Sequence, residues 1–481
     1  MTPRDILITF FIYTALLLLI SWFTSRKANN ESFFVGNRQS PWFVVAYGMI
    51  GASLSGVTFI SIPGDVGSSL STYMMIVFGY LVGYAVIAEV LLPLYYRMKL
   101  TSIYSYLEHR LGFWSYKTGA FYFLVSRVIG ASFRMFLVVN VLQLFVFNAW
   151  NVPFWLTVVI FIFLMVLYTY RGGIKTIVWT DTLQTTFMLA TIIVSIVLIG
   201  NKMDYSFMDM VGAISDSKYS RMFIFDWQHK YFFLKQFISG AFIAIVMTGL
   251  DQDMMQKNLS CKNLKDAKKN IYSMSIALVP MNILILSLGI LLYIFAEANG
   301  INVPQTTDDL FPLIALKYLG GIAGIVFLIG LISAAYSSAD SALTSLTTSF
   351  SIDFMRLDKN EHLSEKQKIN MRQLIHGGVA VTVIIVIIIF NAINDSSVIS
   401  KLFTIAGYTY GPLLGMFSFG IFTQKRPKDS LVPFIAILSP VICYIISSNS
   451  TQWFNGYEFG FELLLLNGAL VFLGLLAVSK K

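Results

Sequence analysis

Apolar runs of about twenty residues recur along all 481 residues, and they constrain the fold more than any other feature of the sequence. A helix of that length crosses the hydrocarbon core of a bilayer, whereas membrane β-barrels show only alternating segments of about ten residues. Charged residues make up 12% of the chain, and this is about half their share in soluble domains. The sequence therefore predicts an all-α polytopic membrane protein with one transmembrane domain, residues 1–481.

The apolar runs divide the chain into about thirteen predicted transmembrane helices. The connections near 201–230, 256–271 and 354–370 are polar, and we expect loops or short amphipathic helices there. The first run lacks a signal-peptide cleavage site, so we expect it to be retained as a span. The predicted spans are 5–25, 41–64, 70–96, 118–148, 152–170, 177–200, 231–255, 272–297, 311–353, 371–392, 400–422, 430–447 and 460–479.

Basic residues predict the orientation of these spans. With the amino terminus outside, 24 lysines and arginines lie in cytoplasmic connections and about 8 lie outside. Five of the 24 are lysines between residues 257 and 269. Because cytoplasmic loops carry an excess of Lys and Arg, we expect the amino terminus out, the carboxyl terminus in, and a multi-pass location in the plasma membrane (bacterial inner membrane). The net charge of +9 follows from this bias and does not indicate nucleic-acid binding.

The odd number of spans predicts an internal repeat. Residues 41–200 and 231–422 each hold five predicted spans and enter the membrane from opposite sides, which is the arrangement of an inverted repeat. One extra helix within residues 1–30 precedes the first repeat, and two extra helices within residues 430–481 follow the second.

Residues 333–351 place polar groups inside an apolar run that begins near Phe311 and that we expect to cross the membrane as one helix. Residues three and four apart share a helix face, and an ionisable group at membrane depth is costly and by default functional. Hydroxyl and carboxylate oxygens suit a hard cation and not zinc or copper. The pattern predicts half of a sodium site, whose face carries Ala334, Ser337, Ser338, Asp340 and Ser341.

Two further polar interruptions could supply the other half. Residues 51–56 contain two glycines and two serines, which weaken a helix and could turn backbone carbonyls toward an ion, or could simply allow close helix packing. Gly172 and Gly173 permit a cytoplasmic turn, and Asp181 lies shortly beyond it. That carboxylate could equally be stabilised by the positive end of its own helix.

Two arginines lie within one predicted span. Arg127 and Arg134 are seven residues apart and so share a helix face. They could bind an anionic group of a solute, for which the guanidinium fork is suited. They could equally neutralise Asp340, Asp181 or Glu89. In residues 405–415, glycines and Pro412 predict a kinked helix whose Tyr408 and Tyr410 either reach a cavity or lie at the membrane interface.

These features occur together and in order, and the chain resembles the sodium:solute symporters, which include proline, pantothenate, sialic-acid, sugar, iodide and choline transporters. The resemblance covers nearly the whole chain and implies a leucine-transporter-like fold, with two inverted five-helix repeats and extra helices at both ends. The matching segments are residues 32–42, 53–63, 170–176, 179–181 and 337–345.

The resemblance implies one sodium site and, in some members, a second, so we expect one Na⁺ or two. By position, the first site consists of the carbonyls of Gly51, Leu54 and Ala334 with the hydroxyls of Ser337 and Ser338. The second site consists of Asp181, Ser337, Asp340 and Ser341, with Ser53 as a further candidate.

Asp340 departs from the sialic-acid-type members, which carry a hydroxyl there, and is more like the Ser-Ser-Ala-Asp-Ser of choline-type members. It could bind sodium, bind a proton, or pair with an arginine. The arginine of core helix three in sialic-acid transporters aligns with Gly130, so the resemblance does not identify the solute. The positions that match the solute pocket are Ser55, Thr58, Phe78 and a residue near Arg134.

The resulting expectation is sodium-coupled symport of a small polar or anionic organic solute into the cell by alternating access, performed by a monomer in the lipid bilayer. Proton coupling through Asp340 or Asp181 is the closest alternative, and a passive channel is a remote one. A membrane-embedded enzyme is also remote, because it needs a cluster of catalytic groups. The four histidines, His109, His229, His362 and His376, are instead scattered and mostly near loops.

Overall fold

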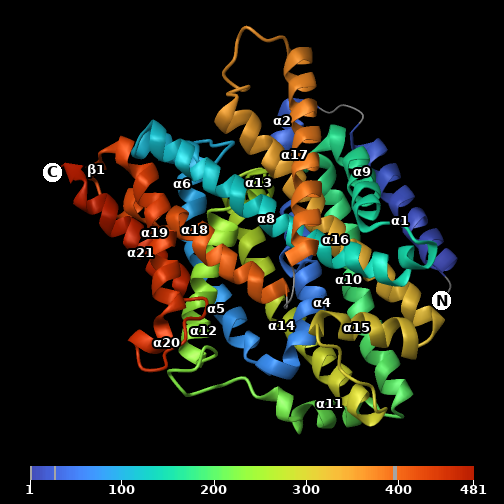
Figure 1. The fold of residues 1–481 in the computed structure, drawn as a ribbon. Helices are drawn as coiled ribbons and strands as arrows, with labels where there is room; N and C mark the ends of the chain where they lie inside the picture. Colours follow the sequence, from blue (N-terminus) through green and yellow to red (C-terminus); the bar gives the residue numbers. More distant parts are fainter. Residues whose placement is uncertain (1–2, 26–28, 394–397, 481) are drawn as a thin grey trace.

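The computed structural model describes residues 3–25, 29–393 and 398–480 as a bundle of long helices (Figure 1). The first helix, α1 (Pro3–Thr24), lies on one flank of the bundle, and the last two long helices, α19 (Val432–Ser448) and α21 (Leu463–Ala477), lie on the opposite flank. Apolar side chains from most helices form one continuous core. The prediction of an all-helical membrane protein is confirmed.

Within the described residues, the α-helices of the first half of the chain run from α1 to α10. After α1 they are α2 (Asn30–Val35), α3 (Trp42–Leu54), α4 (Gly56–Ser69), α5 (Tyr73–Val86), α6 (Leu92–Arg97), α7 (Ser105–Arg110), α8 (Phe113–Phe145), α9 (Phe154–Gly172) and α10 (Ile174–Lys202). Short 3₁₀ or π segments lie at Gly36–Arg38, Ile87–Leu91 and Phe147–Trp150.

The second half continues from α11 to α21. Before α19, the helices are α11 (Phe207–Ser215), α12 (Phe233–Ala244), α13 (Gln252–Leu259), α14 (Leu264–Ala298), α15 (Leu310–Leu313), α16 (Gly321–Ser349), α17 (Glu365–Ile393) and α18 (Val398–Phe422). A short α20 (Ser450–Trp453) precedes α21, and β1 (Arg426–Pro427) pairs antiparallel with β2 (Ser479–Lys480). Short 3₁₀ or π segments lie at Lys218–Ser220, Ile245–Gly249, Thr307–Asp309, Ile314–Tyr318, Phe350–Phe354 and Asp429–Leu431.

Each of the thirteen predicted ranges coincides with a helix or with consecutive helices. Among the described residues, eight helices are long and apolar enough to cross a membrane, or ten if each bent pair is counted as one span. The total of thirteen and the orientation of the termini stay predictions. One range needs a correction: residues 311–353 are not one helix. Gly320 has φ of +98°, a conformation that glycine adopts at little cost, and α16 begins only after it.

Two bent helix pairs interrupt the bundle within the described part of the chain. The helices α3 and α4 meet at 48°, and the segment Phe233–Gly249 meets α13 at 65°. Ser55 forms the first break with φ of +32° and ψ of 172°, a strained conformation for a residue with a side chain. The predicted break within residues 51–56 is therefore confirmed. Each bend lies in the first helix of a predicted five-helix repeat, which agrees with the inverted-repeat prediction but does not test it.

The helix α10 packs between α3 and α16. Gly48 and Gly51 allow the close approach of α3: a Cβ atom on Gly48 would lie 2.8 Å from the Asp181 Cβ, and one on Gly51 would overlap the Thr185 hydroxyl. Gly330 of α16 allows an equally close approach of α16 to the other side of α10, where an added Cβ would overlap Thr191. Small residues thus hold the predicted site elements within contact distance of one another.

Candidate functional site

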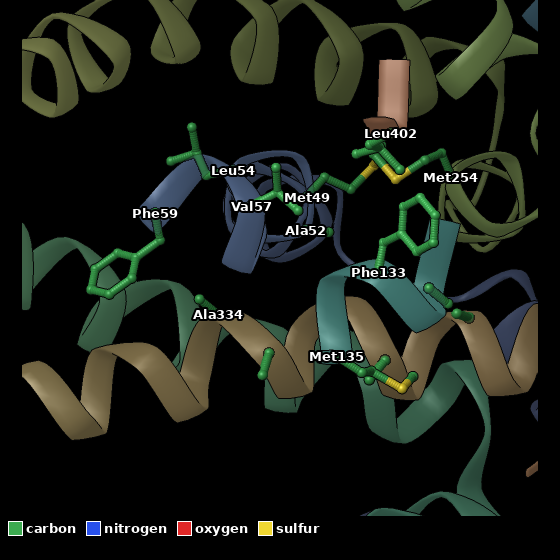
Figure 2. Packing of buried hydrophobic residues seen from close by; sticks show 14 of the residues in the cluster. Met49, Ala52, Leu54, Val57, Phe59, Phe133, Met135, Met254, Ala334 and Leu402 are labelled. Atoms are coloured by element: carbon green, nitrogen blue, oxygen red, sulfur yellow. The ribbon is translucent and has the colours of Figure 1, made fainter. Parts of the chain in front are cut away.

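The five residues predicted for the first sodium site lie on neighbouring elements. Gly51 and Leu54 are in the last turn of α3, and the other three share one face of α16. The break lies against α16, since a Cβ atom on Gly56 would lie 4.0 Å from the Ala335 amide nitrogen. Figure 2 shows Leu54 at the break and Ala334 on α16 in the same part of the core.

The five residues of this group are buried, and two of their carbonyl oxygens already accept hydrogen bonds. The Ser338 hydroxyl donates to the carbonyl of Ala334 at 3.3 Å, and the amide of Ser55 donates to the carbonyl of Gly51 at 2.9 Å. Carbonyl and hydroxyl oxygens without thiolate or imidazole form a donor set for a hard cation. The residues present therefore fit a sodium ion as a coupled substrate.

The predicted second site contains a cation that the sequence analysis did not anticipate. The Lys257 ammonium lies 2.6 Å from Asp181 Oδ2, and each side chain is only 1% exposed. The Ser337 hydroxyl donates to the other oxygen of Asp181, Oδ1, at 3.0 Å. Lys257 lies on α13, whose eight residues are all buried, so its assignment to a cytoplasmic loop is wrong. In the sequence, the one signal that Lys257 is buried is its position just beyond the predicted span 231–255.

Asp340 is fully buried near this ion pair and interacts electrostatically with both of its members. Its oxygens accept hydrogen bonds from the Tyr168 hydroxyl at 3.1 Å and from the Ser341 amide at 2.6 Å. The Ser341 hydroxyl is buried without a hydrogen-bond partner among the described residues. Asp181, Ser337, Asp340 and Ser341 thus lie in one buried region between α9, α10, α13 and α16.

Ser53 lies away from this region. Its hydroxyl donates to the Met274 sulfur at 3.8 Å, and its side chain lines a cavity of about 80 Å³ on the other side of α3. The lining includes Ser53, Ser55, Thr58, Tyr73, Tyr80, Tyr84, Arg127 and Arg134.

Three of the four predicted pocket residues, Ser55, Thr58 and Arg134, line this cavity. Phe78 does not: it packs against the apolar core from another face of α5, about 140° around the helix from the face of the lining tyrosines. The tyrosines themselves share a face through their spacing of seven and four residues, a signal that was present in the sequence.

Arg127 is neutralised by carboxylates of the second bent pair. Its guanidinium forms an ion pair with Asp253 and lies 3.9 Å from Asp251 Oδ2. The Tyr410 hydroxyl donates to Asp251, so this tyrosine reaches the interior. The prediction that Asp340, Asp181 or Glu89 neutralises this arginine is wrong, and Glu89 instead pairs with Lys268 at 2.5 Å.

Arg134 differs from Arg127 in its partners. It faces the cavity, its Nε atom is buried without a hydrogen bond, and it forms no ion pair with any described residue. The guanidinium is partly exposed, and an anion that joins it in the cavity would give it the ion-pair partner that the described residues do not supply. Among the arginines that line the cavity within the described part of the chain, Arg134 is the one available to a solute.

The histidines form no catalytic cluster in the described structure. His376 falls within the predicted span 371–392 and is buried, and its two ring nitrogens lie 2.9 Å from the hydroxyls of Thr169 and Thr347. It therefore links α9, α16 and α17 as a packing residue.

Comparison with known proteins agrees with this architecture. The chain is 22% identical over 473 residues to a sodium/sialic acid symporter of Aliivibrio fischeri, covering 96% of this chain and 92% of the relative. It is 23% identical over 427 residues to human sodium-coupled monocarboxylate transporter 2, covering 86% of this chain and 66% of the relative. The fold matches a Na⁺-coupled sialic acid symporter in its substrate-bound outward-open state, with a TM-score of 0.82, 20% identity and 99% of both chains covered.

The structural match confirms the leucine-transporter-like fold. A family comparison identifies the sodium:solute symporter family over residues 33–429. This is a family of membrane transporters, so the prediction that the protein is not an enzyme is also confirmed. The chain belongs to the sodium:solute symporter family.

Proposed function

We propose that this protein is a sodium-coupled symporter that carries a small organic anion into the cell by alternating access. The observation that carries the proposal is the unpaired guanidinium of Arg134, which faces a cavity next to the α3–α4 break. A carboxylate would supply the missing countercharge with the bidentate geometry that arginine favours. The relatives described above are named for sialic acid and monocarboxylates, which are also organic acids.

Sodium would couple to the solute through the broken helix. An ion bound by Gly51, Leu54, Ala334, Ser337 and Ser338 would hold α3 against α16 and so favour one conformation of the break. Ser55 follows Leu54 directly and lines the cavity, so an ion at the break acts on a pocket residue one position away. Each ligand then stabilises the conformation that the other binds, by the same factor.

In the proposed cycle, sodium enters from outside and stabilises an outward-open state with a formed pocket. Solute binding allows the gates to close, and the site then opens inward, where low sodium favours release. An inward-negative potential contributes about 2.3 kcal/mol per net charge per 100 mV. The protein would work as a monomer in the plasma membrane of a bacterium, with its amino terminus outside.

The experiment is a thermal-shift screen of the purified protein, followed by uptake into proteoliposomes. The screen compares sialic acid and short monocarboxylates with neutral sugars and amino acids, in sodium and in choline buffers at one pH. We expect an organic acid to stabilise the protein in sodium and not in choline, and the same acid to be taken up only with sodium outside. Uptake that is equal in choline would refute sodium coupling.

Proton coupling is the second candidate, because Asp340 is a buried acid without an ion-pair partner among the described residues. Such a group could carry a proton through the cycle. A pH gradient imposed without sodium separates the two mechanisms. Solute accumulation under that condition would favour the proton, and its absence would favour sodium.

A further inference from the structure

The ion pair of Lys257 and Asp181 has no role in the cycle described so far. Both oxygens of the carboxylate are engaged, one by the ammonium at 2.6 Å and the other by the Ser337 hydroxyl at 3.0 Å. The ammonium belongs to α13 and the carboxylate to α10, so the pair joins two core elements 76 residues apart in sequence. Both side chains are almost completely removed from solvent.

A buried carboxylate at membrane depth needs a countercharge, because an isolated ion in a low-dielectric interior is unstable. A mobile monovalent cation could supply it at Asp181, since hydroxyl oxygens of Ser337 and Ser341 lie on the adjoining face of α16. The ammonium of Lys257 supplies the same single positive charge from a compact group with three N–H donors. The chain thus provides from its own sequence the cation that this carboxylate would otherwise take from solution.

We propose that Lys257 is a tethered cation that replaces a second sodium ion at Asp181, so that the transporter binds and couples one sodium and not two. This inference rests on the proposed function of sodium-coupled symport. It assigns Lys257 as the residue that sets the ion stoichiometry, and it leaves the first sodium site as the coupling site.

Ser337 connects the tethered cation to the first site. A hydroxyl has one proton to donate and two lone pairs that accept. Because Ser337 donates its proton to Asp181, its lone pairs remain available to a sodium ion at the break. Lys257 therefore also orients Ser337, through Asp181, and it is a positioning residue for the first sodium ion.

The test is equilibrium binding of ²²Na⁺ to the full-length protein in nanodiscs without solute, at pH 7.5 and 8.5 so that protons do not compete. We expect one bound sodium per chain for the native protein. Lys257→Met should bind two, because Asp181 then lacks its countercharge. The double variant Lys257→Met/Asp181→Asn should return to one. Lys268→Met is the matched control, because it removes a lysine from a more exposed pair with Glu89, and it should stay at one.

Each result decides between the proposals. Two sodium ions bound to the native protein would overturn the inference and leave the proposed function intact, whereas no bound sodium would refute the proposed function. Lys257→Met with one sodium and unchanged affinity would also overturn the inference, because the lysine would then be only a packing element. If Lys257→Met fails to fold, the native count and the double variant, in which neither position 257 nor position 181 carries a charge, still decide.

Discussion

The sharpest prediction of the solute-class proposal is the contrast between the two arginines of α8. Arg134→Gln removes the guanidinium charge that faces the cavity and keeps a polar side chain, which is two atoms shorter. Truncating one member of a buried, hydrogen-bonded charge pair costs about 2–5 kcal/mol of binding free energy. Arg134 is partly exposed, so the lower part of that range applies, about 2–3.5 kcal/mol. This corresponds to a rise of about 30- to 300-fold in the Kd of a carboxylate solute.

Arg127→Gln, in contrast, should lower the folding stability of the protein. Its guanidinium is already paired with Asp253 and lies near Asp251, so its removal leaves buried carboxylates without their countercharge. Breaking such a pair from one side costs about 3–5 kcal/mol of folding stability. We therefore expect a lower melting temperature for Arg127→Gln, and a melting temperature near the native one for Arg134→Gln without solute.

The assay is a solute titration followed by thermal shift in sodium buffer, with the best acid from the screen and its uncharged amide. The native protein should prefer the acid strongly, and Arg134→Gln should bind acid and amide alike. Sodium-induced stabilisation without solute should persist in Arg134→Gln, which shows that the first sodium site is intact. Binding of the acid by Arg134→Gln within threefold of the native Kd would refute the role of Arg134.

Two further predictions concern the broken helix and its contacts. Ser338→Ala and Ser337→Ala should each raise the sodium concentration for half-maximal uptake several-fold, measured at saturating solute, and unchanged sodium dependence in both would contradict the first-site assignment. Gly51→Ala should abolish uptake and lower the melting temperature, because its Cβ atom would overlap the Thr185 hydroxyl. The double variant Gly51→Ala/Thr185→Gly should regain part of the uptake and part of the melting temperature. A fully active Gly51→Ala protein would show that α3 and α10 are not closely packed.

Features that depend on local sequence were predictable. The glycines and serines of residues 51–56 weaken the helix at one point, and the structure breaks it there, at Ser55. The hydroxyl face of α16 follows from helical spacing alone, and it is buried as one surface. The order of the motifs identified the family without any structure.

Features that depend on tertiary contacts were missed. Lys257 stands in a lysine-rich connection, and positive-inside counting treats every such lysine as solvent-exposed. Its burial depends on the 65° bend before α13, which turns that helix back into the core toward Asp181. The partner of Arg127, Asp253, lies on α13 and 126 residues away in sequence, and periodicity within one helix carries no information about a partner on another. The sequence suggested three acids for this role, Asp340, Asp181 and Glu89, and the fold places a different one, Asp253, against Arg127.

The tethered cation has an energetic consequence that a flux experiment can measure. One sodium carried with one monovalent anion moves no net charge, so the membrane potential does no work on the cycle. Two sodium ions would move one net charge, worth about 2.3 kcal/mol per 100 mV, in addition to a second ion gradient. A tenfold sodium gradient is worth about 1.4 kcal/mol per ion. One-ion coupling therefore limits accumulation to about tenfold, whereas two ions at 100 mV allow about 4,000-fold.

Proteoliposomes with a tenfold inward sodium gradient separate these two limits. The potential is set to zero or to an inside-negative 100 mV with potassium and valinomycin, and the plateau ratio of a monocarboxylate is measured. With Lys257 in place, the plateau should stay near tenfold at both potentials, because the charges of the ion and the solute cancel. A plateau that rises with the potential would require a second mobile cation, and the ammonium of Lys257 could then not be its substitute.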